Sequence, residues 1–163
     1  MTYIVDSNFF IEAHRVTYPL DVMPAYWTRI ADLAKQGKII SIDKVKAELD
    51  KHDDELKAWC NNVLPDNFFF NSTTCIEAYR QTVRWAVSKS DQYRPDALAV
   101  FLAAERADAW IVAYALQNNM TVVTQEVSAP DSKKNIKLPD ACIAMEVPSL
   151  NTIGMLRAIG ATI

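Results

Sequence analysis

The sequence has few glycines and no excess of basic residues, and both scarcities limit what the protein can be. Only 3 of the 163 residues are glycine, against 7 prolines, which argues against a flexible or low-complexity chain. With 17 basic and 20 acidic residues, the net charge is −3. This balance excludes a protein that binds nucleic acid mainly through bulk positive charge, but it leaves room for a local basic groove beside an acidic site.

Three further absences concern the cellular compartment. The cysteines, Cys60, Cys75 and Cys142, are odd in number and widely spaced, which argues against a disulfide framework or a structural zinc site and favours a reducing cytoplasm. The start of the chain lacks the basic segment and long apolar segment of a signal peptide. No apolar run is long enough to span a bilayer. We therefore expect a soluble, cytoplasmic protein that does not contact a membrane.

Apolar residues, in contrast, are abundant enough for a sizeable core. Half of the residues are hydrophobic and a tenth are aromatic. A chain of this length should bury about two thirds of its unfolded surface on folding. No internal repeat and no G-x-x-x-x-G-K-[ST] or G-x-G-x-x-G motif is present, so a nucleotide-binding loop has no support. We expect a single domain over residues 1–163.

Short apolar runs alternate with helical patterns along the chain. Strands are predicted at residues 3–5, 38–42, 68–70, 121–124 and 135–138. Helices are predicted at residues 8–15, 25–36, 95–103, 109–117 and 149–159, from Asp43 onward with Val45, Leu49, Leu56 and Trp59 on one face, and around Ile76, Tyr79, Val83 and Val87 as a core stripe. This rhythm is typical of an α/β fold, a three-layer α/β/α sandwich with a central parallel sheet. Such sheets bind ligands at the carboxyl ends of their strands.

Four acids occupy those carboxyl ends or the helices that follow them. Asp6 follows the first predicted strand and Glu48 lies in the second turn of the helix after the second strand. Asp108 stands just before the helix that leads to strand 121–124, and Glu126 follows that strand directly. A parallel sheet brings such positions to one edge, so we expect the four carboxylates to lie together.

Each acid also has an ordinary structural role open to it. Asp6 and Asp108 are of a type that caps helices, and for Asp6 capping and ligand binding are equally supported by the sequence. Glu48 has neighbouring lysines and a histidine with which to pair on a solvated helix face. Glu126 could be a surface loop acid. The joint placement of all four favours a site over four separate structural roles.

Clustered carboxylates without compensating bases repel one another strongly in a partly buried cleft. A divalent cation removes that repulsion, and hard oxygen ligands without nearby His or Cys favour Mg²⁺ or Mn²⁺ over zinc. Such ions serve phosphodiester chemistry, because they hold phosphate oxygens and activate a water for in-line attack.

Three segments, YIVDSNFFI, VKAELD and DAWIVAYALQNNMTVVTQE, resemble the three signatures of PIN-domain nucleases. The last is the most specific: an acid, an alanine-rich helix, a short turn, and a strand that ends in Val-Val-Thr-x-acid. The resemblance covers nearly the whole chain and is closest to PIN-like proteins akin to the toxin ribonucleases of toxin–antitoxin pairs. It implies the strand order 3-2-1-4-5, with the first strand in the centre.

The resemblance also implies roles for individual residues. Asp6, Glu48 and Asp108 match the acids that bind Mg²⁺ or Mn²⁺ and drive RNA hydrolysis in PIN domains. Asn8 and Thr124 match polar positions that support those acids. The function implied is that of a metal-dependent endoribonuclease of the toxin type, with RNA as substrate.

The fourth acid departs from the family pattern. PIN domains usually carry Asp where this chain has Glu126, so Glu126 completes the site with a longer arm or Asp140 replaces it. The loop that follows brings Lys133, Lys134 and Lys137 near the expected acidic cleft. Phosphate contact and simple solvation are equally supported for these lysines.

The resemblance allows an antitoxin partner and a homodimer, and two other functions remain open. A non-catalytic PIN-like module that binds nucleic acid or protein gains weight from the Glu126 departure. A Mg²⁺-dependent phosphohydrolase loses weight, because a phosphoaspartyl mechanism needs a second acid two residues after the nucleophilic Asp. That place is held here by Asn8.

Overall fold

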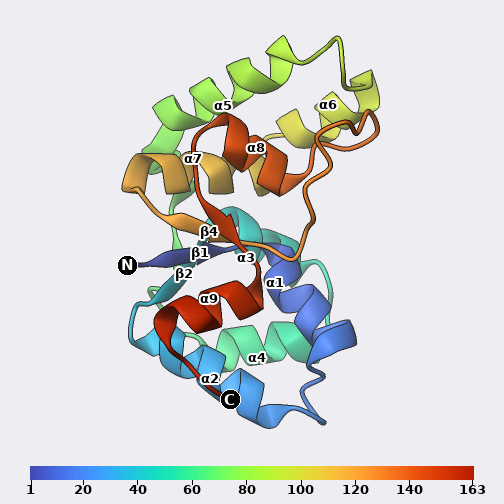
Figure 1. Cartoon of the computed structure of the whole chain (residues 1–163). Helices are drawn as coiled ribbons and strands as arrows, with labels where there is room; N and C mark the ends of the chain where they lie inside the picture. Colours follow the sequence, from blue (N-terminus) through green and yellow to red (C-terminus); the bar gives the residue numbers. More distant parts are fainter.

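The computed structural model describes residues 1–163 and is built around a parallel sheet of five short strands (Figure 1). The strands are β1 (Tyr3–Val5), β2 (Ile39–Ile42), β3 (Phe69–Phe70), β4 (Thr121–Val123) and β5 (Ser149–Leu150). They are arranged in the order β3-β2-β1-β4-β5, with every neighbouring pair parallel. The predicted three-layer class and the strand order 3-2-1-4-5 are therefore confirmed, and the fold is PIN-like.

Helices cover both faces of the sheet (Figure 1). On one face lie α5 (Ile76–Ser88), α6 (Pro95–Leu102), α7 (Asp108–Asn118) and α8 (Leu138–Ala144); on the other lie α2 (Pro24–Lys35), α4 (Glu55–Val63) and α9 (Thr152–Ile159). The helices α1 (Ser7–Glu12) and α3 (Asp43–Asp50) begin directly after β1 and β2. None of these helices has the length and apolarity needed to cross a membrane.

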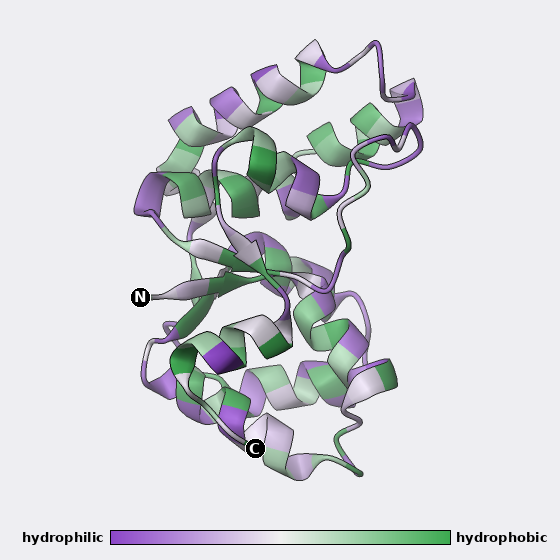
Figure 2. Ribbon diagram, viewed as in Figure 1, coloured by the Kyte–Doolittle hydropathy of each residue, from purple (hydrophilic) through white to green (hydrophobic).

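The core consists of 43 buried hydrophobic residues on both sides of the sheet. Strand β1 is buried along its whole length, as expected for a central parallel strand covered on both faces. The alanine-rich helix α7 is buried from Ala109 to Ala115, and Figure 2 shows its hydrophobic colouring beside the strands. Because the side chains of β1 and of the neighbouring helix α7 are apolar, the first predicted strand lies in the buried centre of the sheet.

The last strand was predicted in the wrong place. Residues 135–137 are not a strand, and Leu138 begins α8 with Pro139 in its first turn. Proline is favoured at the start of a helix, where its missing N–H costs nothing, so Pro139 was a helix signal rather than a strand end. The fifth strand is instead β5, which pairs through Ser149 with Val122 and is too short to show a period.

Three helix predictions were wrong in extent. The helix predicted at residues 149–159 begins only at Thr152, because Ser149 and Leu150 form β5. The stripe of Val45, Leu49 and Leu56 belongs to two helices, α3 and α4, because a turn interrupts the chain and Asp54 caps α4 by accepting a hydrogen bond from the Lys57 N–H. The helix predicted at residues 8–15 continues through a π-helical turn, η1 (Ala13–Thr17), and so extends two residues beyond the prediction.

The buried face of α5 also differs from the prediction. Ile76 and Val87 are 42% and 53% exposed, whereas Ala78, Thr82 and Ala86 are buried. These small residues recur at a spacing of four, so they form one face of α5. That face packs against α7, where small side chains allow two helices to approach closely. The close packing of small residues, rather than the more hydrophobic stripe, therefore determines which face of α5 is buried.

Candidate active site

Asp6 lies at the carboxyl end of the central strand and is only 3% exposed. Its Oδ1 accepts a hydrogen bond of 2.8 Å from the Phe9 N–H, so Asp6 is the N-cap of α1. Its Oδ2 accepts a 2.5 Å hydrogen bond from the Thr124 hydroxyl, at the end of β4. Burial raises the pKa of Asp6 to about 8, with smaller contributions from the negative charges of Asp108 and Glu126. The structure thus shows the capping role, together with proximity to two of the other predicted acids.

Thr124 connects the ends of the two central strands. Besides donating to Asp6, its hydroxyl oxygen accepts a 3.2 Å hydrogen bond from the Glu126 N–H. Thr124 is 2% exposed, so it orders the site from inside the protein. Asn8, the other predicted supporting residue, is exposed and forms no side-chain hydrogen bond within the chain.

Glu48 is held from two sides. Its Oε1 accepts a 2.9 Å hydrogen bond from the N–H of Ala107, immediately before α7, and its Oε2 accepts a hydrogen bond from the Ser7 hydroxyl in α1. The carboxylate of Glu48 therefore joins α3 to the starts of α1 and α7. Ser7 was missed in the sequence, although its place beside Asp6 in the DSN triplet was a signal.

Asp108 is the first residue of α7, and its carboxylate accepts no hydrogen bond within the chain. Burial raises the pKa of Asp108 to about 7, and the negative charges of Glu126 and Glu48 add to the increase. The positive charges of Arg106 and Lys137 act in the opposite direction. Asp108 is thus a carboxylate without a structural partner that lies within electrostatic reach of two other acids.

Glu126 lies between β4 and the long loop that leads to α8. Its Oε2 accepts a 2.7 Å hydrogen bond from the N–H of Leu138, the first residue of α8. No hydrogen bond occupies its other oxygen, and the residue shares the wall of a cleft with Asp108. The additional methylene of Glu, relative to Asp, lets one side chain reach the start of α8 from the end of β4.

Asp140 is engaged elsewhere. It accepts hydrogen bonds of 2.5 Å from the Ser128 hydroxyl and 2.9 Å from the Ala129 N–H, so it fastens the loop after Glu126 to α8. Its charge does not contribute to the raised pKa of Asp6 or Asp108. Of the two acids considered for the fourth position, Glu126 lies near Asp6 and Asp108, whereas Asp140 contacts the loop after Glu126.

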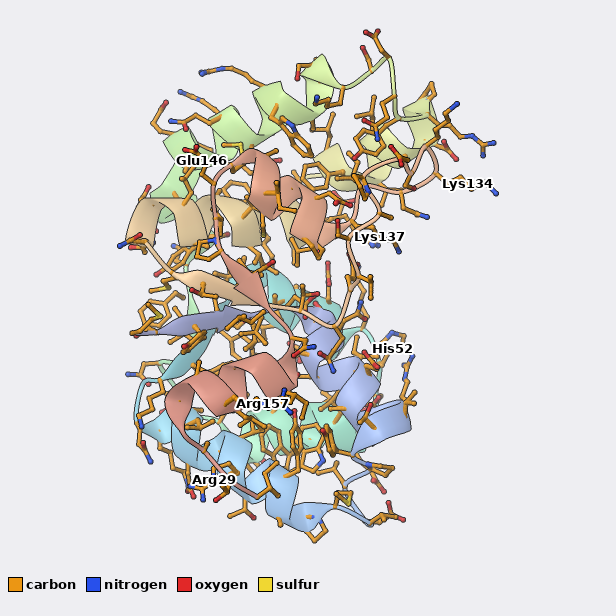
Figure 3. All side chains as sticks on the ribbon, in the orientation of Figure 1. Arg29, His52, Lys134, Lys137, Glu146 and Arg157 are labelled. Atoms are coloured by element: carbon orange, nitrogen blue, oxygen red, sulfur yellow. The ribbon has the colours of Figure 1, made fainter.

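The predicted basic residues divide into two groups. Lys134 and Lys137 line the cleft that contains Asp108 and Glu126, and Figure 3 shows both on the loop before α8. Lys133 is exposed and does not line it; its backbone carbonyl accepts a 2.9 Å hydrogen bond from the Arg94 N–H. Arg106, which was not among the predicted basic residues, also lines the cleft.

The metal expected at this site is Mg²⁺ or Mn²⁺. No three of the His, Cys, Asp and Glu side chains are grouped as ligands of one ion in this structure. Mg²⁺, however, keeps several waters and is commonly bound by only one or two carboxylates. The pKa values of two carboxyl groups are raised mainly by burial and further by nearby acids, so added positive charge is favourable at this site. The residues present therefore fit Mg²⁺ or Mn²⁺ by their chemistry.

The fold of this chain is similar to that of a solved protein complex. The crystal structure of VapBC2 from Rickettsia felis, bound to a DNA fragment from their promoter, matches with a TM-score of 0.53 over 93% of this chain and 98% of the other. The sequence identity is 15%, so the similarity concerns the fold. A comparison with curated proteins found no significant match. Residues 3–163 match the family described as "Domain of unknown function (DUF4411)", and the chain belongs to that family.

Proposed function

We propose that this protein is a metal-dependent endoribonuclease that hydrolyses RNA phosphodiester bonds, of the type found in toxin–antitoxin pairs. The observation that carries the proposal is the gathering of Asp6, Glu48, Asp108 and Glu126 at the carboxyl edge of a PIN-like sheet, with raised pKa values for Asp6 and Asp108. Folding alone does not favour such a cluster, because burial and mutual repulsion both oppose its ionisation.

The four acids have distinct roles in this proposal. Asp6 and Asp108 would hold Mg²⁺ or Mn²⁺, which supplies positive charge at the phosphate and lowers the pKa of an attacking water. Glu48 is fixed at both oxygens by Ser7 and Ala107, so it presents its charge in a constant orientation.

Glu126 has one oxygen free of hydrogen bonds and would complete the site or orient the water. Lys134 and Lys137, at the rim of the cleft, would contact phosphate groups.

The partner is also a proposal. A toxin-type nuclease is held inactive by an antitoxin, and the structural neighbour is a complex named VapBC2. We propose a cognate antitoxin for this chain as well, and a homodimer as its oligomeric state. Co-purification of the chain with the product of an adjacent gene, followed by measurement of the mass of the complex in solution, tests both.

The function is tested by incubating the purified protein with a 5′-labelled single-stranded RNA in the presence of Mg²⁺, Mn²⁺ or a chelator. We expect internal cleavage that requires the metal and produces discrete fragments. Metal-independent cleavage would contradict the proposed chemistry. Binding of the RNA without any cleavage under all conditions would instead support a non-catalytic binding module.

A further inference from the structure

A cleft of about 270 Å³ adjoins Asp108 and Glu126, and metal binding alone does not account for it. Asp108 and Glu126 form part of its wall, so the cleft is continuous with the candidate active site. The rest of the wall comes from α6, from Arg106 and from residues 134–137 of the loop before α8. We call this feature the α6 cleft.

One wall of the α6 cleft is apolar. Ala97, Val100 and Phe101 lie on one face of α6, at the i, i+3, i+4 spacing of helical neighbours, and Ile136 joins them from the loop. Val100 is 55% exposed, whereas the other three are almost fully buried. A branched apolar side chain left open to solvent beside a catalytic site provides a surface for an apolar part of the substrate.

Polar groups without partners lie along the same cleft. The carboxylate of Asp96 forms no salt bridge, and neither it nor the side-chain amide of Asn135 forms a hydrogen bond within the chain. A carboxylate accepts hydrogen bonds, while an amide both donates and accepts them. These are the groups that proteins use to bind the edges of unpaired bases.

Positive charges complete the cleft. Arg106, Lys134 and Lys137 line it, and none of them forms a salt bridge with an acidic side chain. Their charges are therefore available to the phosphates on either side of a bound nucleotide. The cleft thus offers three kinds of group: an apolar wall, unpaired hydrogen-bonding groups and cations without salt bridges. They match the face of a base, its edge and the adjacent phosphates better than they match a peptide side chain.

We propose that the α6 cleft binds one unpaired nucleobase of the RNA, next to the phosphate held at the acids. This inference rests on the proposed function and adds to it a preference in substrate sequence. The cleft is smaller than the roughly 300 Å³ at which pockets for drug-sized ligands begin, so it accommodates a single base and not a stacked pair. Because the Asp96 carboxylate only accepts hydrogen bonds, bases with an exocyclic amino group, which has two N–H donors, are preferred over uracil, which has only its ring N–H to donate.

The first test measures binding without cleavage. The metal-free protein, labelled with ¹⁵N, is titrated with each of the four nucleoside 5′-monophosphates and followed by NMR. We expect shifts in α6 and residues 134–137, and weaker binding of UMP than of GMP, AMP or CMP. Because the larger side chain fills the cleft and excludes the base, Val100→Trp should weaken the binding of these three by about tenfold to a hundredfold.

Val87→Trp is the matched control, because Val87 is 53% exposed and lies on α5, outside the α6 cleft. It should bind all four nucleotides as the parental protein does. A third variant, Asp96→Asn, should reduce the difference between UMP and the other three. Equal nucleotide binding by the parental and Val100→Trp proteins, or shifts confined to other elements, would overturn the proposal and leave the cleft to a side chain of a protein partner.

The second test uses RNA with one abasic nucleotide at a mapped cleavage site. We expect cleavage there to fall by about tenfold or more relative to the intact RNA. The two proposals fail separately. A protein that binds the monophosphates in the cleft but cleaves no RNA retains the subsite and loses the proposed function. A protein that cleaves intact and abasic sites equally retains the function and loses the subsite.

Discussion

The two edges of the sheet form hollows of opposite character. At the amino edge, a hollow of about 360 Å³ is lined by residues that include Thr2, Gly37, Phe70 and Met120, and it contains no acid. At the carboxyl edge, the smaller α6 cleft contains Asp108 and Glu126 together with three basic residues. The larger hollow is a gap between packed elements. The smaller one contains clustered acidic groups, whose burial and mutual repulsion oppose folding. The presence of such unfavourable charges, rather than the volume of the hollow, indicates which edge of the sheet carries the candidate functional site.

The largest difference between the edges is expected in catalysis. Asp6→Asn and Asp108→Asn should each reduce RNA cleavage to below detection, because each removes a metal-binding carboxylate from the carboxyl edge. Both variants should remain folded: Asn can replace Asp6 as the N-cap of α1, and neither substitution removes a charge that stabilises the metal-free protein. Cleavage assays with circular dichroism spectra measure both effects. Parental cleavage rates in both variants would refute the assignment.

Glu126 offers a sharper test of the same edge. Glu126→Asp should lower single-turnover cleavage by about a hundredfold, because a shift on the order of 1 Å at a positioned group has that effect. The shorter side chain cannot keep its hydrogen bond to the Leu138 N–H and its place in the cleft together. Glu126→Gln should lose more activity.

Asp140→Asn is the control for Glu126, since Asp140 fastens the loop and does not face the acids. It should destabilise the protein by about 1 to 3 kcal/mol through a disturbed buried hydrogen bond, with little loss of cleavage. If both Glu126 variants cleaved at the parental rate and Asp140→Asn were inactive, Asp140 rather than Glu126 would be the fourth acid of the site.

Metal ions should stabilise the protein through the carboxyl edge. At a concentration of about 100 times Kd, a ligand bound only by the folded state adds about 2.7 kcal/mol, which for a chain of this size raises Tm by about 5 to 10 °C. Thermal unfolding with and without Mn²⁺ or Mg²⁺ measures the shift. Asp6→Asn should respond less than the parental protein, and an equal response would place the metal elsewhere.

The raised pKa values predict how the stability of the metal-free protein depends on pH. Between pH 4 and 8 the folded state holds protons on Asp6 and Asp108 that the unfolded state has released, because the folded pKa values are about 8 and about 7. Stability should therefore fall as pH rises through this range. Chemical denaturation at a series of pH values should give a smaller slope for Asp6→Asn. A stability that rises with pH in the parental protein would mean that the two carboxyls are ionised.

The smallest effect is expected at the amino edge. Gly37 has a φ of +67° after α2, a conformation that costs other residues about 1 to 2 kcal/mol, while no atom lies within 4 Å of an added Cβ. Gly37→Ala should lower the unfolding free energy by about that amount and leave RNA cleavage unchanged. A change in cleavage would show that the amino edge takes part in function.

The sequence by itself determined the central part of the fold. The apolar runs at β1, β2 and β4, and the alanine-rich pattern of α7, are local signals that identify buried strands and a buried helix without reference to the rest of the chain. The acids that lie next to these strands and helices are placed at the carboxyl edge of the sheet by the same local signals. The positions of Asp6, Glu48, Asp108 and Glu126 at one edge could therefore be predicted.

Only the tertiary structure decided the features that depend on distant partners. Strand β5 exists because two residues pair with β4, and the buried face of α5 is set by close packing on α7, so neither leaves a clear period in the sequence. The different positions of Glu126 and Asp140 depend on which backbone N–H each carboxylate meets, that of Leu138 or that of Ala129. Local patterns record whether a residue is buried, but the identity of its partner is fixed only when distant segments come together.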